Sequence, residues 1–152
     1  MLRVTLAAAA LVVVFSSRSS AQTRIIPEDW LPALAPSIRY ALDELKEANA
    51  QMEMNMLSRQ VADMTDAQLF IAYVRLYEKL PAKERAKLVE EQTRWLKERS
   101  KAAKKGVQSE GGSLAPLEAN NAELIYTEKR LAELRARLKA APAKKKATDE
   151  DE

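Results

Sequence analysis

The chain has 152 residues, with 25 Lys and Arg against 22 Asp and Glu, and it contains neither cysteine nor histidine. These absences exclude disulfides, thiolate chemistry, lipid attachment through cysteine and any site that needs histidine as a base or metal ligand. Without Arg3 and Arg18 of the N-terminal segment, the chain has 23 basic and 22 acidic residues. We expect no basic stripe, and aromatic residues are few, so the sequence argues against nucleic-acid binding.

The N-terminal segment has the layout of a secretory signal peptide. Arg3 precedes an apolar run from Val4 to Phe15, and Ser19-Ser20-Ala21 offers small residues at the −3 and −1 positions of a cleavage site. The apolar run is shorter than the roughly 20 residues that a membrane-spanning helix needs. We therefore expect a signal peptide at residues 1–21, cleaved near Ala21, and a periplasmic or secreted protein without a membrane span. An uncleaved anchor is the alternative.

The rest of the chain has a helix-forming composition. Ala, Leu, Glu, Lys, Arg and Gln dominate it, and the whole chain has only three glycines. Residues 22–36 are rich in proline and predict an extended lead-in, with Trp30 and Leu31 docking on the helices. Pro36 suits the first turn of a helix. A core-facing stripe continues that helix to about Asp63 and comprises Ile38, Leu42, Leu45, Asn49, Met52 and Met56.

A second helix is expected to begin at Thr65. Thr65 with Gln68 three residues later has the pattern of a capping box, and Asp66 suits the electropositive end of a helix. Pro81 ends this helix at Leu80, because the residue before proline is disfavoured in the α region. A single helix running through Thr65 is the alternative.

Pro81 then opens a third helix, which fades through Lys104-Lys105-Gly106, and Pro116 opens a fourth, which Pro142 ends. The fourth helix has a heptad pattern typical of a coiled coil, formed by Leu117, Leu124, Leu131 and Leu138. Short connections favour antiparallel neighbours. The sequence thus predicts an all-α fold: a small antiparallel bundle of about four helices at residues 37–141, followed by a disordered charged tail at 142–152.

Two polar stripes distinguish this bundle. Gln92, Trp95 and Arg99 share one helix face, and Thr127, Arg130 and Leu134 repeat the same spacing. An arginine on a half-buried face needs an acceptor, and Glu53 and Asp66 lie beside predicted core stripes. We therefore expect a structural polar network, with Trp95 as a core anchor, formed by Glu53, Asp66, Gln92, Trp95, Arg99, Thr127 and Arg130. A catalytic carboxylate pair is the alternative, but no nucleophile accompanies it.

Met52, Met54 and Met56 resemble a thioether copper site. On a helix Met52 and Met56 share a face, whereas Met54 points away from them. We therefore expect two core methionines and one half-exposed one, with no metal and no cofactor. Gly111-Gly112-Ser113 lacks the flanking residues of a phosphate loop and predicts either a turn with positive φ or an exposed tip that contacts a partner.

Five blocks along the chain resemble the LprI-like lysozyme-inhibitor domain family, small exported helical proteins of bacteria. The blocks are Gln51 to Met56, Thr65 to Phe70 followed by Tyr73, Gln92 to Arg99, Gly111-Gly112-Ser113, and the set Thr127, Arg130 and Leu134. The family's cysteine positions are occupied here by Met56, Ala103 and Ala122, so its disulfides are absent. The family's lipobox is also missing.

The resemblance implies a non-catalytic periplasmic protein that inhibits a lysozyme by occluding it, without a cofactor or small-molecule substrate. The proposed partner-binding loop comprises Lys104, Lys105, Ser109, Gly111, Gly112 and Ser113. The alternative is an envelope interaction module or a chaperone-like helical protein, suggested by the heptad leucines and the charged tail.

Overall fold

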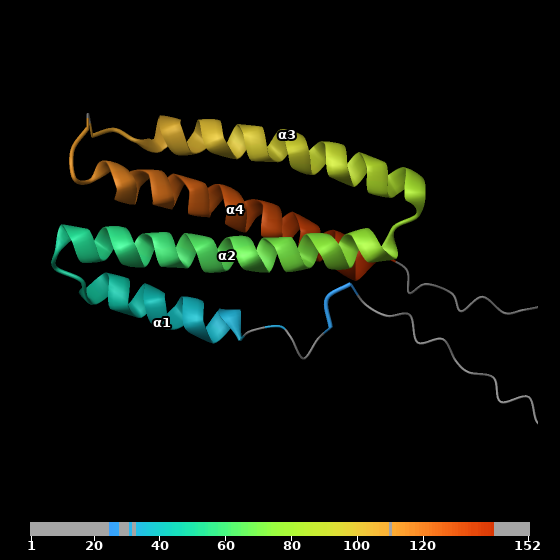
Figure 1. The fold of residues 1–152 in the computed structure, drawn as a ribbon, viewed down its shortest axis with the longest axis horizontal. Helices are drawn as coiled ribbons and strands as arrows, with labels where there is room; N and C mark the ends of the chain where they lie inside the picture. Colours follow the sequence, from blue (N-terminus) through green and yellow to red (C-terminus); the bar gives the residue numbers. More distant parts are fainter. Residues whose placement is uncertain (1–24, 28–30, 32, 110, 142–152) are drawn as a thin grey trace, which may run out of the picture.

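The structure is a computed structural model that describes residues 25–27, 31, 33–109 and 111–141. This part of the chain forms four helices and no strand: α1 (Leu34–Glu47), α2 (Gln51–Lys79), α3 (Ala82–Gly106) and α4 (Ala115–Ala140). Consecutive helices run antiparallel, which confirms the predicted all-α bundle (Figure 1). The predicted signal peptide, Trp30 and the predicted tail after Ala141 lie outside the described residues.

The helices lie side by side in the order α1, α2, α4, α3 (Figure 1). α2 packs against both α1 and α4, and α4 packs against both α2 and α3, so α1 and α3 form the two edges. The α1–α2 connection and the α3–α4 loop lie at the same end of the molecule. Within the described residues, the outer side of each edge helix has no helix packed against it.

The main core is shared by α2, α3 and α4. It consists of Leu69, Ala72, Leu76, Leu88, Trp95, Leu131 and Leu134. Trp95 is buried in this cluster, and its ring stacks on Tyr126 with the centroids 6.0 Å apart, as expected of a core anchor. The heptad leucines of α4 are buried or half-buried within this chain, so contacts inside the molecule account for their pattern.

The first helix break lies elsewhere than predicted. Instead of continuing to Asp63, α1 ends at Glu47, and Ala48 is extended with its N–H donating to the carbonyl of Glu44. The Asn49 side chain donates to the carbonyl of Glu47 at 3.0 Å and so satisfies one of the open carbonyls at the helix end. An asparagine that hydrogen-bonds the local backbone therefore ends the helix without glycine or proline.

The predicted helix start at Thr65 is wrong, because α2 runs through it without interruption. Thr65 is buried, and its hydroxyl donates to the carbonyl of Val61 one turn earlier at 2.8 Å. That bond is compatible with a helix interior and takes the place of the expected cap. The alternative of one continuous helix is correct. The later boundaries at Pro81, Gly106 and Pro116 agree with the prediction, and α1 begins two residues before Pro36.

The expectation of two core methionines is also wrong. Met52 and Met56 are 84% and 62% exposed, while Met54 is half-buried. The break after Glu47 separates the register of α2 from that of α1, and Leu57, Val61 and Leu69 lie on the inner face instead.

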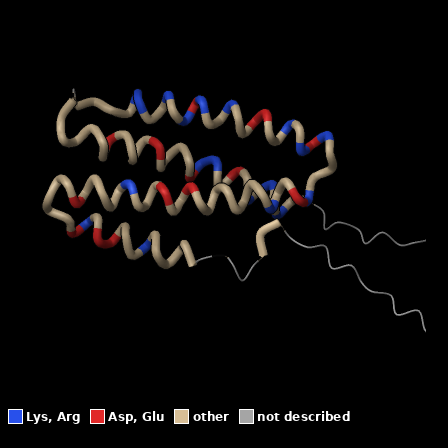
Figure 2. The backbone as a smooth tube through the Cα atoms, viewed as in Figure 1, with Lys and Arg blue, Asp and Glu red and all other residues tan. Residues whose placement is uncertain are grey.

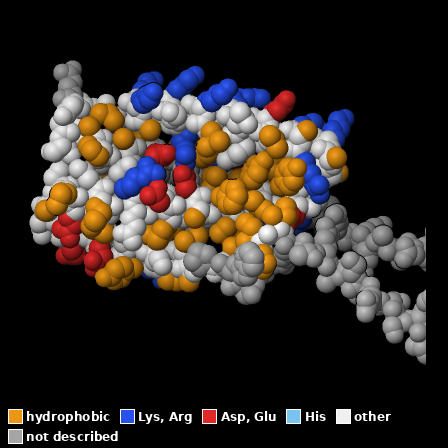
Figure 3. Space-filling view, viewed as in Figure 1, with side chains coloured by type: hydrophobic (Ala, Val, Ile, Leu, Met, Phe, Trp, Pro, Cys, Tyr) orange, Lys and Arg blue, Asp and Glu red, His pale blue; other side chains and the backbone are white. Residues whose placement is uncertain are grey.

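A basic stripe is present although none was expected. α3 contains nine Lys and Arg against four Glu, and the basic positions recur along the whole helix (Figure 2). Basic side chains line its outer edge (Figure 3). Overall charge balance concealed this asymmetry, because α1 and α2 together are slightly acidic. None of the described helices is both long and apolar enough to cross a bilayer.

Candidate functional site

The loop between α3 and α4 is exposed at one end of the bundle. Gln108 and the segment from Gly111 to Leu114 are exposed, whereas Ser109 is half-buried. Gly111 has a φ of 65°, a conformation that residues with a side chain adopt only with strain. The N–H of Ala115 donates to the carbonyl of Gly112 at 3.1 Å and leads the chain into α4. The prediction of a glycine turn with positive φ is therefore correct at Gly111.

Glu118, in the first turn of α4, holds the α3 side of this loop. Its Oε2 accepts from the backbone N–H of Gln108 at 2.9 Å, from the N–H of Ser109 at 3.0 Å and from the Ser109 hydroxyl at 2.8 Å. These hydrogen bonds, the backbone bond from Ser109 foremost, lower the pKa of Glu118 because they favour the ionised carboxylate. Three donors on one oxygen fix the course of the loop as it leaves α3.

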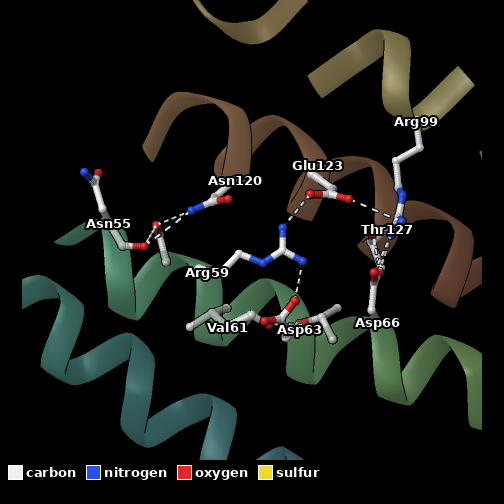
Figure 4. Close-up of polar contacts among 11 residues, drawn as sticks. Asn55, Arg59, Val61, Asp63, Asp66, Arg99, Asn120, Glu123 and Thr127 are labelled. Atoms are coloured by element: carbon white, nitrogen blue, oxygen red, sulfur yellow. Dashed lines mark hydrogen bonds and ion pairs between the residues drawn. The ribbon is translucent and has the colours of Figure 1, made fainter. Parts of the chain in front are cut away.

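Asn55, near the start of α2, holds the other side of the loop. Its Nδ2 donates to the Ser113 carbonyl at 3.0 Å, and its Oδ1 accepts from Gln51 at 2.9 Å. Behind it, the buried Asn120 of α4 donates to the Ser58 hydroxyl at 2.9 Å (Figure 4). The N-terminal parts of α2 and α4 are thus tied to each other, and α2 is also tied to the loop.

Apolar and cationic side chains surround the loop. Met52 and Met56 flank Asn55 on α2, and Leu114 ends the loop with 45% of its surface exposed. Lys104 and Lys105 are exposed in the last turn of α3. We define the docking tip as the described loop residues 107–109 and 111–114 together with the side chains of Met52, Met56, Lys104 and Lys105. It combines flexible apolar groups with charged donors on a fixed backbone.

A polar network behind the tip joins three helices. Arg99 on α3 donates through Nη1 to Asp66 on α2 at 2.6 Å and to the Thr127 hydroxyl on α4 at 3.3 Å. Thr127 donates in turn to Asp66 at 3.2 Å. Glu123 on α4 lies 3.3 Å from Nη2 of Arg99 and accepts from Arg59 at 3.1 Å, while Arg59 also pairs with Asp63 (Figure 4).

Arg130 is the centre of a second network, between α3 and α4. It is only 8% exposed and donates to Gln92 at 3.2 Å, to Glu133 at 3.2 Å and to Glu91 at 3.4 Å. Burial would raise the pKa of Glu91, but the hydrogen bonds and charges of Arg137 and Arg130 outweigh it and lower that pKa. Arg130 thus has the acceptors that a buried guanidinium requires.

The structure brings together most of the residues that the sequence grouped. Gln92, Trp95 and Arg99 all face neighbouring helices, and Asp66 contacts both Arg99 and Thr127. Glu53 lies apart from this group: it is exposed in the first turn of α2, and in the described part of the chain it pairs with neither arginine. Ser109 turns its hydroxyl toward Glu118 and so helps to hold the loop.

Sequence reasoning missed several members of these contacts. Glu123 and Arg59 are charged residues within otherwise ordinary helical patterns, and only the packing of α2 against α4 brings them together. Glu118 did carry a signal, since an acidic residue in the first turn of a helix beside a glycine loop can accept backbone donors. In both networks the carboxylates are paired with arginines. These ion pairs hold the helices together, and the paired carboxylates do not form a free acid–base pair.

Comparison with known proteins adds one finding. A family model described as "Lysozyme inhibitor LprI" matches residues 43–134, more than half of the chain. The matched range extends from α1 to α4 and includes the loop, both polar networks and the core tryptophan. No match was found among curated proteins or among solved structures.

Proposed function

Because the chain belongs to the LprI lysozyme-inhibitor family, we propose that it is an exported, non-catalytic protein that binds a lysozyme and occludes its substrate cleft. The family assignment supports a lysozyme-inhibitor-like role and a protein partner. The occlusion, the export and the surface that makes the contact are our proposals. The observation that carries the proposed occlusion and contact surface is the docking tip, which is exposed and yet held by Glu118 and Asn55.

The form of the tip suits insertion into a cleft. The start of α2, the end of α3 and the start of α4 converge there with the loop, and hydrogen bonds fix the backbone before any partner arrives. A preorganised loop loses less conformational entropy on binding than a mobile one, so more of the contact energy appears as affinity. Met52, Met56 and Leu114 add exposed apolar surface of adaptable shape.

The chemistry of the tip suits the target. A glycosidase cleft is concave and holds two carboxyl groups that flank the scissile bond. Lys104 and Lys105 place ammonium groups beside the loop, and cations at this position complement acidic groups in the cleft. Charge complementarity of this kind contributes orientation and association rate more than affinity.

A turbidity assay on bacterial cell walls tests the function directly. The purified chain is mixed with c-type, g-type and i-type lysozymes, and we expect slower clearing with at least one class at micromolar protein. Unchanged clearing with all three would exclude inhibition of these enzymes.

Two matched variants locate the contact surface. Ser113→Glu adds one negative charge within the tip, and Ala132→Glu adds the same charge on exposed α4 far from the loop. We expect the first to weaken inhibition at least tenfold, the effect of about 1.4 kcal/mol, and the second to leave it unchanged. Equal inhibition by both variants would place the contact outside the tip.

Export is tested separately. The chain is expressed in a bacterial host, and the mass of the exported protein is measured. A mass that corresponds to a start near Gln22 supports the cleaved signal peptide, whereas an intact Met1 in the membrane fraction supports an uncleaved anchor.

A further inference from the structure

The outer face of α3 carries a straight row of cations. The positions of this row recur every three or four residues, so they lie along one side of the helix. They are Lys83, Lys87, Arg94, Lys97, Lys101 and Lys104, all exposed, with Glu90 as the one acidic residue in the row. We call this row the basic edge. It extends over about 30 Å at 1.5 Å per residue.

The basic edge has no role in holding the described fold together. α3 is an edge helix, and its principal helix contact is with α4 on the opposite side. Figure 3 shows basic side chains along the free margin of the molecule over α3. Of the six, Lys87 has an ion pair with Glu84 on the same helix, at 3.1 Å between two exposed groups, and such a pair contributes little to stability.

We propose that this edge binds the surface of an anionic phospholipid bilayer, with the axis of α3 parallel to the membrane. A convex, nearly straight row of cations on a rigid helix fits a flat array of phosphate groups, because each ammonium or guanidinium can reach a headgroup at the same time. Binding of this kind needs no pocket. It does not rest on the proposed lysozyme binding: Lys104 belongs to both surfaces, but the other five cations of the row lie outside the docking tip.

A second observation favours a bilayer over a soluble polyanion. Val89 and Leu96, two helical turns apart on α3, are 44% and 46% exposed and lie about a third of a turn around the helix from the centre of the basic edge. A membrane interface accepts both the charged groups and shallow apolar side chains, as it does for amphipathic helices. A single-stranded nucleic acid would instead be expected to stack on exposed aromatic rings, and the single aromatic residue of α3, Trp95, is buried.

Cosedimentation with vesicles tests the proposal. The full chain is mixed with vesicles of phosphatidylcholine alone, which give the baseline, and with vesicles of equal parts phosphatidylcholine and phosphatidylglycerol. We expect added binding to the anionic vesicles, lost at about 1 M salt, where the Debye length falls to about 3 Å. Equal binding to both compositions would overturn the proposal.

Two triple variants with the same net charge separate the edge from overall charge. Arg94→Gln/Lys97→Gln/Lys101→Gln removes three edge cations, and Arg39→Gln/Lys46→Gln/Lys79→Gln removes three exposed cations from α1 and α2. Each edge cation is expected to contribute about fivefold, so the first variant should bind anionic vesicles about a hundredfold more weakly. The second variant should lose much less of its affinity for anionic vesicles. Equal losses would mean that net charge alone is responsible, which contradicts the proposal.

A further variant distinguishes the bilayer from other polyanions. Val89→Ser/Leu96→Ser should weaken vesicle binding while leaving any binding to polyphosphate or duplex DNA unchanged. If the full chain binds either soluble polyanion as tightly as vesicles, and this variant binds vesicles normally, the edge is a polyanion site and the bilayer proposal is wrong.

Discussion

Arg99 on α3 reaches Asp66 on α2 with 2.6 Å between Nη1 and Oδ2, and both side chains contact the buried Thr127 of α4 between them. α2 and α3 make few other contacts with each other, because α4 separates them along most of their length. The Arg99–Asp66 pair therefore fixes the position of the edge helix relative to α2, and with it the end of α3 from which the docking tip extends.

The pair should stabilise the fold measurably. The Arg99 and Asp66 side chains are 15% and 31% exposed, so removing one leaves its partner poorly solvated. We expect Arg99→Ala and Asp66→Ala each to lower the free energy of unfolding by about 1–3 kcal/mol. The double variant should lose less than the sum, with a coupling of about 1 kcal/mol in a denaturant-based double-mutant cycle.

The Arg59–Asp63 pair provides the control for this cycle. Its side chains are 48% and 58% exposed and lie one turn apart on α2. A coupling of only about 0.3–0.5 kcal/mol is expected there. If the two cycles gave equal couplings, the Arg99–Asp66 bond would be no more than a surface ion pair.

A close approach of α3 and α4 makes Gly106 sensitive to substitution. A Cβ at Gly106 would lie 2.4 Å from the Cβ of Ala122, closer than real contacts allow, so one helix would have to shift. We expect Gly106→Ala to destabilise the protein by about 1–3 kcal/mol in thermal or urea unfolding, despite the better helix propensity of alanine.

Gly112→Ala is the matched control in the same loop, because its Cβ would meet only the Ser109 side chain at 3.8 Å. That variant should lie within about 0.5 kcal/mol of the unchanged chain. A neutral Gly106→Ala substitution would show that the two helices separate at low cost.

The sequence could predict the helices wherever a residue type restricts the backbone. Pro81 and Pro116 restrict φ and remove a donor, and Gly111 permits positive φ, so the boundaries near them were correct. Thr65 was misleading because a threonine hydroxyl can bond either forward as a cap or backward to the carbonyl one turn earlier, and local pattern does not distinguish these cases. Asn49 ended α1 through a side-chain bond that the apolar stripe concealed.

The candidate site was only partly predictable for a related reason. The spacing of Gln92 and Arg99 showed that they share a face, but their acceptors depend on how three helices pack. Arg130 therefore pairs with Glu91 and Glu133 rather than with Glu53 or Asp66. The spacing along α3 places the cations of the basic edge on one side of that helix, but the near balance of 25 basic and 22 acidic residues in the chain gives no sign of this local excess.

The structural role of Thr65 leads to a further prediction. If Thr65 were an N-cap, loss of its hydroxyl would lower the free energy of unfolding by about 1 kcal/mol. Inside a continuous helix, the Val61 carbonyl keeps its backbone partner, and Val has nearly the same shape in a buried position. We therefore expect Thr65→Val to change the free energy of unfolding by less than about 0.5 kcal/mol, with unchanged helix content by circular dichroism. A clear loss of helicity would mean that the Thr65 hydroxyl caps a helix, as the sequence predicted.

Acidification should release the docking tip before it unfolds the core. The hydrogen bonds from Ser109 and Gln108 hold the pKa of Glu118 below the ordinary value of 4.5. A lowered pKa means that the contribution to stability is fully present above 4.5 and is lost as the pH falls through the folded-state pKa. NMR should therefore show the backbone amide signals of Gln108 and Ser109 shifting toward unbonded values, with the midpoint of the change below pH 4.5.

The Glu118→Gln variant is the control. Its Gln108 and Ser109 amides should show no such titration, because the glutamine side chain is neutral throughout. A midpoint at or above 4.5 in the unchanged chain would mean that these bonds do not hold the carboxylate in solution, and the loop would then lack the preorganisation on which its proposed role depends.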